Sequence, residues 1–172
     1  LTVSSSGVDI SDERKEYLHN MDLDDMQFPS QGQKFRISAE QAIPVGSAPI
    51  AFTRFNANLT HFQPIGQPTL IFNLQAGTMT GTPPPYEAYN LGGTNSVRGY
   101  QLGELGGGSS FLQSTAELRW PLGEMSIFGS QVPFRLSAFA DYGTAFGTAS
   151  RVFGQPAVVR NKPDSGFGYG LG

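Results

Sequence analysis

Two stretches in the second half of the sequence alternate between apolar and polar side chains for about ten residues each, the length of a tilted membrane strand. In residues 112–120 the even positions are apolar or small and the odd positions are polar. Residues 134–142 repeat this pattern, with Phe139 as a break in the polar row. Successive side chains of a β-strand point to opposite faces. Each stretch therefore predicts a strand with one apolar and one polar face.

Four other stretches carry a similar pattern and bring the prediction to about six strands joined by turns. They are residues 35–39, 50–62, 70–76 and 166–172. Within the second of them the alternation slips near Arg54, which predicts a β-bulge at that residue.

The chain divides at a Pro/Gly turn, Phe28-Pro-Ser-Gln-Gly32. Residues 1–27 are predicted as a polar N-terminal segment of uncertain structure. Within it, residues 12–18 favour a short helical turn and residues 22–25 a solvated loop. Residues 28–172 hold all of the predicted strands.

The polar rows indicate a membrane barrel and not a soluble β-sandwich. A sandwich also alternates, but its polar face meets bulk water and is rich in Lys and Glu. Here the polar rows are mostly Gln, Asn, Ser, Thr and Gly, and only 15% of the residues are charged. Trp120, next to Pro121, is expected at a strand end in the aromatic girdle of a bilayer interface.

The predicted fold is all-β and antiparallel, a segment of a transmembrane β-barrel that is incomplete in this chain. About six strands cannot close a barrel, because the smallest membrane barrels have about eight. An open edge in hydrocarbon would leave backbone groups unpaired, so other sequence or a partner must complete the sheet. A small eight-stranded barrel is the alternative, and it would need two more strands within residues 1–30 or 147–165.

Charge and composition exclude several partners. The net charge of −3 and the absence of a Lys/Arg block argue against nucleic acid. No apolar run reaches the ~20 residues of a membrane helix, and no signal peptide is recognisable. The chain has no cysteine, which suits an oxidising compartment such as the periplasm and outer membrane.

The sequence offers little for catalysis, and we expect no enzyme, metal or cofactor. The two histidines, His19 and His61, lack the spacing of a zinc motif. The acidic residues within 22–25 do not form a calcium-binding pattern. Glu117 and Asp141 could be read as the carboxylate pair of a hydrolase, but a structural ion pair is the favoured interpretation.

The Gly-rich segment 91–105 carries the most specific motif: Leu-Gly-Gly-Thr-Asn-Ser-Val-Arg-Gly-Tyr-Gln-Leu-Gly-Glu-Leu. It resembles the long extracellular loop of the Omp85 (BamA-type) outer-membrane proteins, which folds into the barrel and sets an arginine against acidic residues of the inner wall. The matching positions are Gly92, Gly93, Val97, Arg98, Gly99 and Tyr100.

Further stretches match the same family in the expected order. Residues 116–122 resemble the strand after this loop, and residues 139–144, with their Asp-x-Gly, resemble the next strand. The resemblance covers about residues 28–172 and is closest to cyanobacterial Omp85 and the related chloroplast channel Toc75. It implies the C-terminal part of a barrel of about 16 strands, an even number within the bacterial range, with its loop at about residues 81–110.

The residues themselves support one detail of this resemblance. Glu117 and Asp141 both fall on odd, polar positions of their strands, so both carboxylates point into the lumen if the even positions face lipid. A carboxylate away from bulk water needs a partner, and Arg98 can supply a fixed fork of donors. Such a pair in a wet lumen contributes about 1–3 kcal/mol. Beside it, Gly99 is expected to allow a special backbone conformation and Tyr100 to pack on the wall.

The resemblance implies a function in outer-membrane β-barrel assembly and insertion. The expected partners are unfolded outer-membrane protein substrates, membrane lipids, periplasmic repeats of the same protein and accessory subunits. The expected location is the outer membrane of a Gram-negative-type bacterium, with the chloroplast outer envelope as the alternative. A polypeptide-translocating pore, for two-partner secretion or chloroplast import, is the alternative function, because such pores share the loop motif.

Overall fold

The computed structural model describes residues 13–23, 29–43, 51–147 and 162–172, and for residues 13–23 it describes the backbone only. Asp24 and Asp25, part of the expected solvated loop, lie outside the described residues. Most of the 147–165 segment, where the small-barrel alternative required a strand, lies outside them as well.

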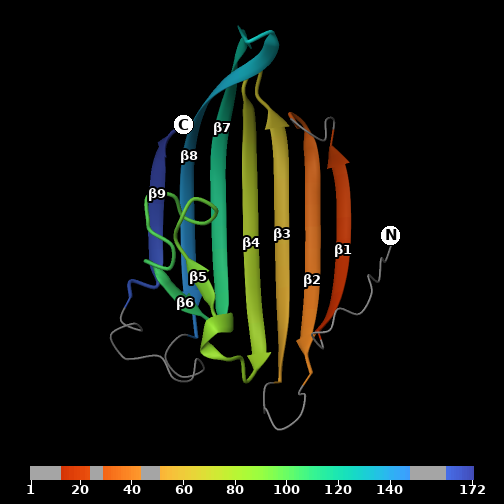
Figure 1. Cartoon of the computed structure of the whole chain (residues 1–172), viewed down its shortest axis with the longest axis vertical. Helices are drawn as coiled ribbons and strands as arrows, with labels where there is room; N and C mark the ends of the chain where they lie inside the picture. The colour runs from red at the N-terminus through yellow and green to blue at the C-terminus, as the bar shows by residue number, and fades with distance from the viewer. Residues whose placement is uncertain (1–12, 24–28, 44–50, 148–161) are drawn as a thin grey trace.

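Seven long strands form one antiparallel sheet, in the order β1-β2-β3-β4-β7-β8-β9 (Figure 1). Strands that are neighbours in this sheet also follow one another in the sequence. The exception is the pair β4 and β7, which are separated by a long loop that contains β5 and β6. The strands are β1 (Glu13–Leu23), β2 (Gly32–Ala42), β3 (Phe52–Pro64), β4 (Thr69–Gly81), β7 (Ser110–Ile127), β8 (Ser130–Phe146) and β9 (Ser165–Leu171).

The segment between β4 and β7 folds back over the sheet. It contains a 3-10 turn, η1 (Pro85–Glu87), and a small two-stranded sheet of β5 (Tyr89–Leu91) and β6 (Gly106–Gly108). Figure 1 shows this loop lying across β7, β8 and β9 near one end of the strands. We call the sheet surface that it covers the inner face and the opposite surface the outer face.

The register between strands gives the two faces different chemistry. Thr115 of β7 pairs with Asn73 of β4 and with Asp141 of β8, and these polar residues share the inner face. Three residues further along β7, Leu118 pairs with Leu70 on the outer face. The outer face is apolar across the sheet, with exposed Phe35, Phe55, Phe72, Leu112, Leu136, Tyr142, Phe167 and Leu171. An apolar outer face around a polar interior is the pattern of a membrane barrel wall.

The structure corrects the prediction for the N-terminal segment. Residues 13–23 form strand β1, not a helical turn, and all eleven of its residues pair with β2. The large sheet therefore has seven strands where about six were expected. Only one of the two further strands that the small-barrel alternative required is found, so the sheet remains open across the part of the chain described here.

The predicted bulge at Arg54 is also wrong. β3 pairs with β2 and β4 in unbroken register from Phe52 onward. The alternation slips because Phe52 is an apolar residue on the inner face, where it is 6% exposed and lies beside the Arg54 guanidinium. A tertiary contact, and not a backbone irregularity, produced the pattern.

The real bulge lies in β7, where the register with β8 shifts between Pro121 and Gly123. Trp120 is therefore not at a strand end, since β7 continues to Ile127. Figure 1 shows the resulting β7–β8 hairpin rising past the ends of the other strands, at the end of the sheet away from the loop. Among the residues that the structure describes, no helix is long and apolar enough to cross a bilayer.

Candidate functional site

The loop is seated on the inner face by a small apolar core. Leu91, Val97 and Leu105 of the loop are at most 1% exposed and pack with Ala145 of β8. The ring of Tyr100 packs against this cluster, and its hydroxyl donates to the Phe167 carbonyl at 3.3 Å. The expected wall contact of Tyr100 is therefore present, with a backbone partner for its hydroxyl. Burial of these side chains anchors the loop to the wall independently of the ion pairs.

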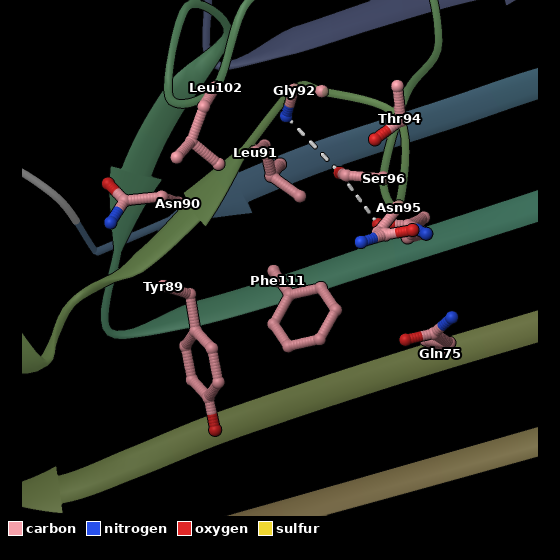
Figure 2. A pocket seen from close by; sticks show the side chains of 12 residues that line it. Gln75, Tyr89, Asn90, Leu91, Gly92, Thr94, Asn95, Ser96, Leu102 and Phe111 are labelled. Carbon is pink, nitrogen blue, oxygen red and sulfur yellow. Dashed lines mark hydrogen bonds between the residues drawn. The ribbon is translucent and has the colours of Figure 1, made fainter.

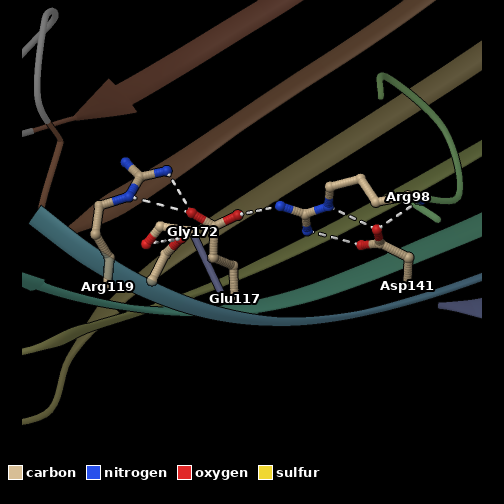
Figure 3. Close-up of polar contacts among 6 residues, drawn as sticks. Arg98, Glu117, Arg119, Asp141 and Gly172 are labelled. Carbon is tan, nitrogen blue, oxygen red and sulfur yellow. Dashed lines mark hydrogen bonds and ion pairs between the residues drawn. The ribbon is translucent and has the colours of Figure 1, made fainter. Parts of the chain in front are cut away.

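Arg98 is held by two carboxylates on neighbouring strands (Figure 3). Its Nε and Nη2 donate to the two oxygens of Asp141 on β8, at 2.7 and 2.8 Å. Its Nη1 donates to Glu117 on β7 at 2.9 Å, and its backbone N–H also donates to Asp141, at 3.1 Å. Bidentate pairing of this kind is among the strongest polar contacts that a protein makes. We call Arg98, Asp141 and Glu117 the tip clamp.

The surroundings of the tip clamp explain how its charged side chains can lie away from bulk water. Asp141 is fully buried, whereas the side chain of Arg98 is 24% exposed. The second oxygen of Glu117 accepts two bonds from Arg119, so the four side chains carry no net charge. The Arg98 guanidinium also lies 3.5 Å from the ring centroid of Phe139, which is a close cation–π contact. The hydrogen bonds that Arg98 donates to Asp141 raise the pKa of Arg98 above its usual value, so Arg98 stays charged.

Two glycines of the wall allow the loop tip to come this close. A Cβ at Gly143 would lie 2.6 Å from the Val97 side chain, and one at Gly168 would lie 2.0 Å from the Arg98 carbonyl oxygen. The Asp-x-Gly stretch of β8 thus has two physical functions. Asp141 binds Arg98, and Gly143 leaves room for the side chain of Val97.

The loop glycines predicted from the sequence all have positive φ. Gly99 has φ 95°, a value that side-chain-bearing residues rarely adopt, and a Cβ there would meet nothing within 4 Å. The backbone conformation expected at Gly99 is therefore present, but no close approach accompanies it. Gly92 and Gly93 also have positive φ, of 110° and 95°, and the Gly93 N–H donates to the Tyr100 carbonyl at 2.9 Å.

A second arginine holds the base of the loop. Arg54 of β3 donates through Nη2 to both the carbonyl (2.8 Å) and the carboxylate (2.5 Å) of Glu87 in η1. Its Nη1 reaches Glu40 of β2 at 3.4 Å, and its guanidinium lies 5.5 Å from the ring centroid of Tyr89. We call Arg54, Glu40 and Glu87 the base clamp. Its arrangement is the opposite of that in the tip clamp, because here the wall supplies the arginine and the loop supplies a carboxylate.

Neither the base clamp nor the position of Phe139 beneath Arg98 was predicted from the sequence. The sequence contained a signal for each of them, because the alternation slips near Arg54 and is broken at Phe139. In both cases a residue breaks the polar pattern of the inner face where the loop contacts it.

An open cavity of about 420 Å³ separates the loop from the wall (Figure 2). Tyr89 and Ser96 of the loop line it, together with Gln75 of β4 and Gln113 of β7. The hydroxyl of Ser96 accepts from the Gly92 N–H at 3.2 Å and donates to the Gln113 side chain at 2.8 Å. Polar groups of Gln75, Ser96 and Gln113 share this lining with Leu91, Leu102 and Phe111, so the loop is held at discrete points and is not sealed onto the wall.

Comparison with known proteins identifies this arrangement. Residues 17–172 match the Omp85 superfamily domain. The chain belongs to the Omp85 superfamily. Its match begins within β1, upstream of the resemblance noted in the sequence. The sheet has the fold of BamA from Haemophilus ducreyi, in a crystal structure lacking POTRA domains 1–3, with a TM-score of 0.71 and 20% identity over 92% of this chain and 35% of that one. The expected fold, an antiparallel barrel segment, is thereby confirmed.

The curated relatives are proteins of chloroplasts. Outer envelope protein 80 of Arabidopsis thaliana is 39% identical over 138 residues, which are 80% of this chain and 18% of that protein. Protein TOC75 of Pisum sativum is 30% identical over an alignment of 185 positions, covering 99% of this chain and 21% of that protein. The chain thus spans about a fifth of the length of these two relatives.

Proposed function

We propose that this Omp85 domain segment forms part of the barrel wall, with its inward-folded loop, of a protein that assembles and inserts β-barrel proteins into an outer membrane. The observation that carries the proposal is the tip clamp, in which Arg98 joins the loop to adjacent strands through Asp141 and Glu117. A loop fixed at this point gives the inside of the barrel a defined shape. In this proposal the charged residues position the loop and do not catalyse a reaction.

The partners proposed for the full-length protein are unfolded outer-membrane protein substrates, membrane lipids, its own periplasmic repeats and accessory subunits. The proposed location is the outer membrane of a Gram-negative-type bacterium, with a cyanobacterium as the favoured source. The alternative location is the chloroplast outer envelope, and the chloroplast relatives support it.

A charge swap in the full-length protein tests the proposal, with insertion of a reporter barrel into vesicles as the assay. Arg98→Glu places three carboxylates together and should abolish insertion. Adding Asp141→Arg restores an opposite pair and should recover part of the activity. Adding Glu117→Arg should recover less, because the new arginine would lie next to Arg119, which now binds Glu117 at 2.8 Å. Normal insertion by the Arg98→Glu protein would contradict the proposal.

The alternative function is a polypeptide-translocating pore, in line with the similarity to TOC75. The same variants separate the two functions. In a translocating pore, releasing the loop should change ion conductance and passage of an unfolded polypeptide while leaving reporter-barrel insertion at the level of empty vesicles throughout. In an assembly protein, insertion itself should follow the state of the tip clamp.

A further inference from the structure

The β7–β8 hairpin extends beyond the turn that joins β3 and β4. β4 begins at Thr69, opposite Arg119. From Pro121 onward, therefore, no strand in the part of the chain that the structure describes pairs with the β7 side of the hairpin. We call residues 121–135 the hairpin tip.

The hairpin tip exposes an unusually large number of apolar side chains for its length. Every residue from 121 to 134 is exposed. Clustered apolar side chains of this kind mark a contact with a membrane or another protein. The exposed large apolar residues are Leu122 (66%), Met125 (50%), Ile127 (38%), Phe128 (105%), Val132 (37%) and Phe134 (40%).

The register places the paired side chains among these, Met125, Ile127, Val132 and Phe134, on one face. Beyond the bulge, Met125 pairs with Val132 and Gly123 with Phe134, on the same face as the outer-face pair of Trp120 and Leu136. The opposite face carries polar groups and prolines: Pro121, Glu124, Ser126, Gln131 and Pro133. The apolar face of the hairpin tip is thus a continuation of the outer face of the barrel wall.

The hairpin tip lies beyond the hydrocarbon that the wall crosses. β3 and β4, with 13 residues each, already exceed the ~9–11 residues that a tilted strand needs to span a bilayer. The tip adds roughly 20 Å of ribbon, at about 3.3 Å per residue. Standing straight up, it would expose its apolar face to water. The bulge with Gly123 (φ 115°) lies at its base, and bulges bend strands.

We propose that the hairpin tip bends outward at this bulge and lies on the lipid bilayer, with its apolar face in the boundary between headgroups and acyl chains. An outward bend turns the outer face down onto the lipid and the Glu124–Gln131 face up to water, which is the orientation of an interfacial amphipathic element. Continuity with the lipid-facing wall favours lipid as the occupant. Glu124 and Arg135 leave the tip without net charge, so nothing in it selects a charged protein partner. The inference needs only that the sheet spans a membrane, and it holds for insertion or translocation.

Site-specific fluorescence in the full-length protein tests this placement. This chain has no cysteine, so single cysteines can be introduced into a protein freed of any others and labelled with an environment-sensitive dye. Val132→Cys and Phe128→Cys report on the apolar face and turn, and Gln131→Cys is the matched control on the polar face. Leu112→Cys, on the outer face of the spanning region, reports whether the sheet is in the bilayer at all.

In phosphatidylcholine vesicles, the dyes at 132 and 128 should emit at shorter wavelength than the dye at 131. They should also be quenched by lipids that carry a nitroxide near the headgroup, and resist aqueous iodide. If iodide quenches the dye at 132 as strongly as the dye at 131, the tip stands in water and the proposal fails. If neither quencher reaches it, protein covers the tip and the proposal fails equally. A dye at 112 that no nitroxide lipid quenches would instead overturn the membrane placement of the whole sheet.

Discussion

Removing the Arg98 side chain should release the tip of the loop while leaving the barrel wall folded. Arg98→Ala deletes three side-chain hydrogen bonds, at 2.7, 2.8 and 2.9 Å, to two carboxylates. It also leaves the fully buried Asp141 without its charged partner. Breaking a buried pair from one side costs about 3–5 kcal/mol. The lower end applies here, because Arg98 is 24% exposed and an open cavity lies close by.

A cost of about 3 kcal/mol corresponds to roughly a hundredfold change in the equilibrium between docked and undocked loop. Hydrogen–deuterium exchange of the full-length protein in lipid nanodiscs measures this change directly. Amides of residues 93–100 should exchange about a hundredfold faster in Arg98→Ala, whereas amides of β4 and β8 should keep their protection. Arg98→Lys retains a charge but loses the fork, and we expect an intermediate rate.

Arg119→Ala is the matched control, because it removes the other arginine bound to Glu117 without touching the loop. It should leave exchange of residues 93–100 close to that of the unmodified protein. If Arg98→Ala leaves the exchange of these residues unchanged, or if Arg119→Ala accelerates it equally, the tip clamp does not hold the loop and the reasoning fails.

Three further predictions concern the rest of the loop. Arg54→Ala should free the base of the loop, and exchange of residues 86–89 should rise about tenfold, for a loss of roughly 1–3 kcal/mol; unchanged exchange there would argue against the base clamp. Gly168→Ala places a Cβ 2.0 Å from the Arg98 carbonyl oxygen, so it should displace the loop tip and impair insertion while the barrel still shows its folded mobility on an unheated gel; full activity would show that the contact is dispensable. Burial raises the pKa of Tyr89, in the loop, from 10.0 to about 12. The neutral hydroxyl, which donates to Asn56 at 2.7 Å, therefore stabilises the docked loop below about pH 10, and this contribution is lost as the pH rises from 10 toward 12. Tyr89→Phe should weaken docking by about 1 kcal/mol and remove this alkaline dependence, as measured by loop exchange against pH.

The strands of the barrel wall could be predicted because the two faces of each strand lie in different environments. An apolar outer face and a polar inner face impose a period of two, and residues 112–120 and 134–142 show it almost without interruption. The same period placed Glu117 and Asp141 on one face, so the partners of Arg98 could be predicted without coordinates. The structure brings these three side chains together, while their importance for function stays a prediction.

What the sequence did not reveal depends on contacts between distant residues. β1 was missed because a charged segment with little alternation forms a strand by pairing its backbone with β2. A bulge was predicted at Arg54 because apolar Phe52 lies on the inner face, beside an arginine whose partner, Glu87, is 33 residues away in the loop. The hairpin tip was missed because Pro121 is a common strand terminator, whereas here the bulge lets the pairing continue past it.

The inner face of β9 carries no side chains at all in its middle, because Gly166, Gly168 and Gly170 occupy the successive inward positions. Leu105, the Arg98 carbonyl and Phe139 fill the space that side chains would take. Tolerance to substitution along this strand should therefore differ between its two sides. Outward positions such as Phe167 and Tyr169 can exchange among apolar residues. A larger residue at Gly166 or Gly168 would have to move the loop, and one at Gly170 would have to move Phe139 of β8. In related proteins whose loop docks in the same way, we therefore expect glycine at every second position of this strand. The glycines would be conserved because of the groups that pack against β9, and not because the strand itself requires them.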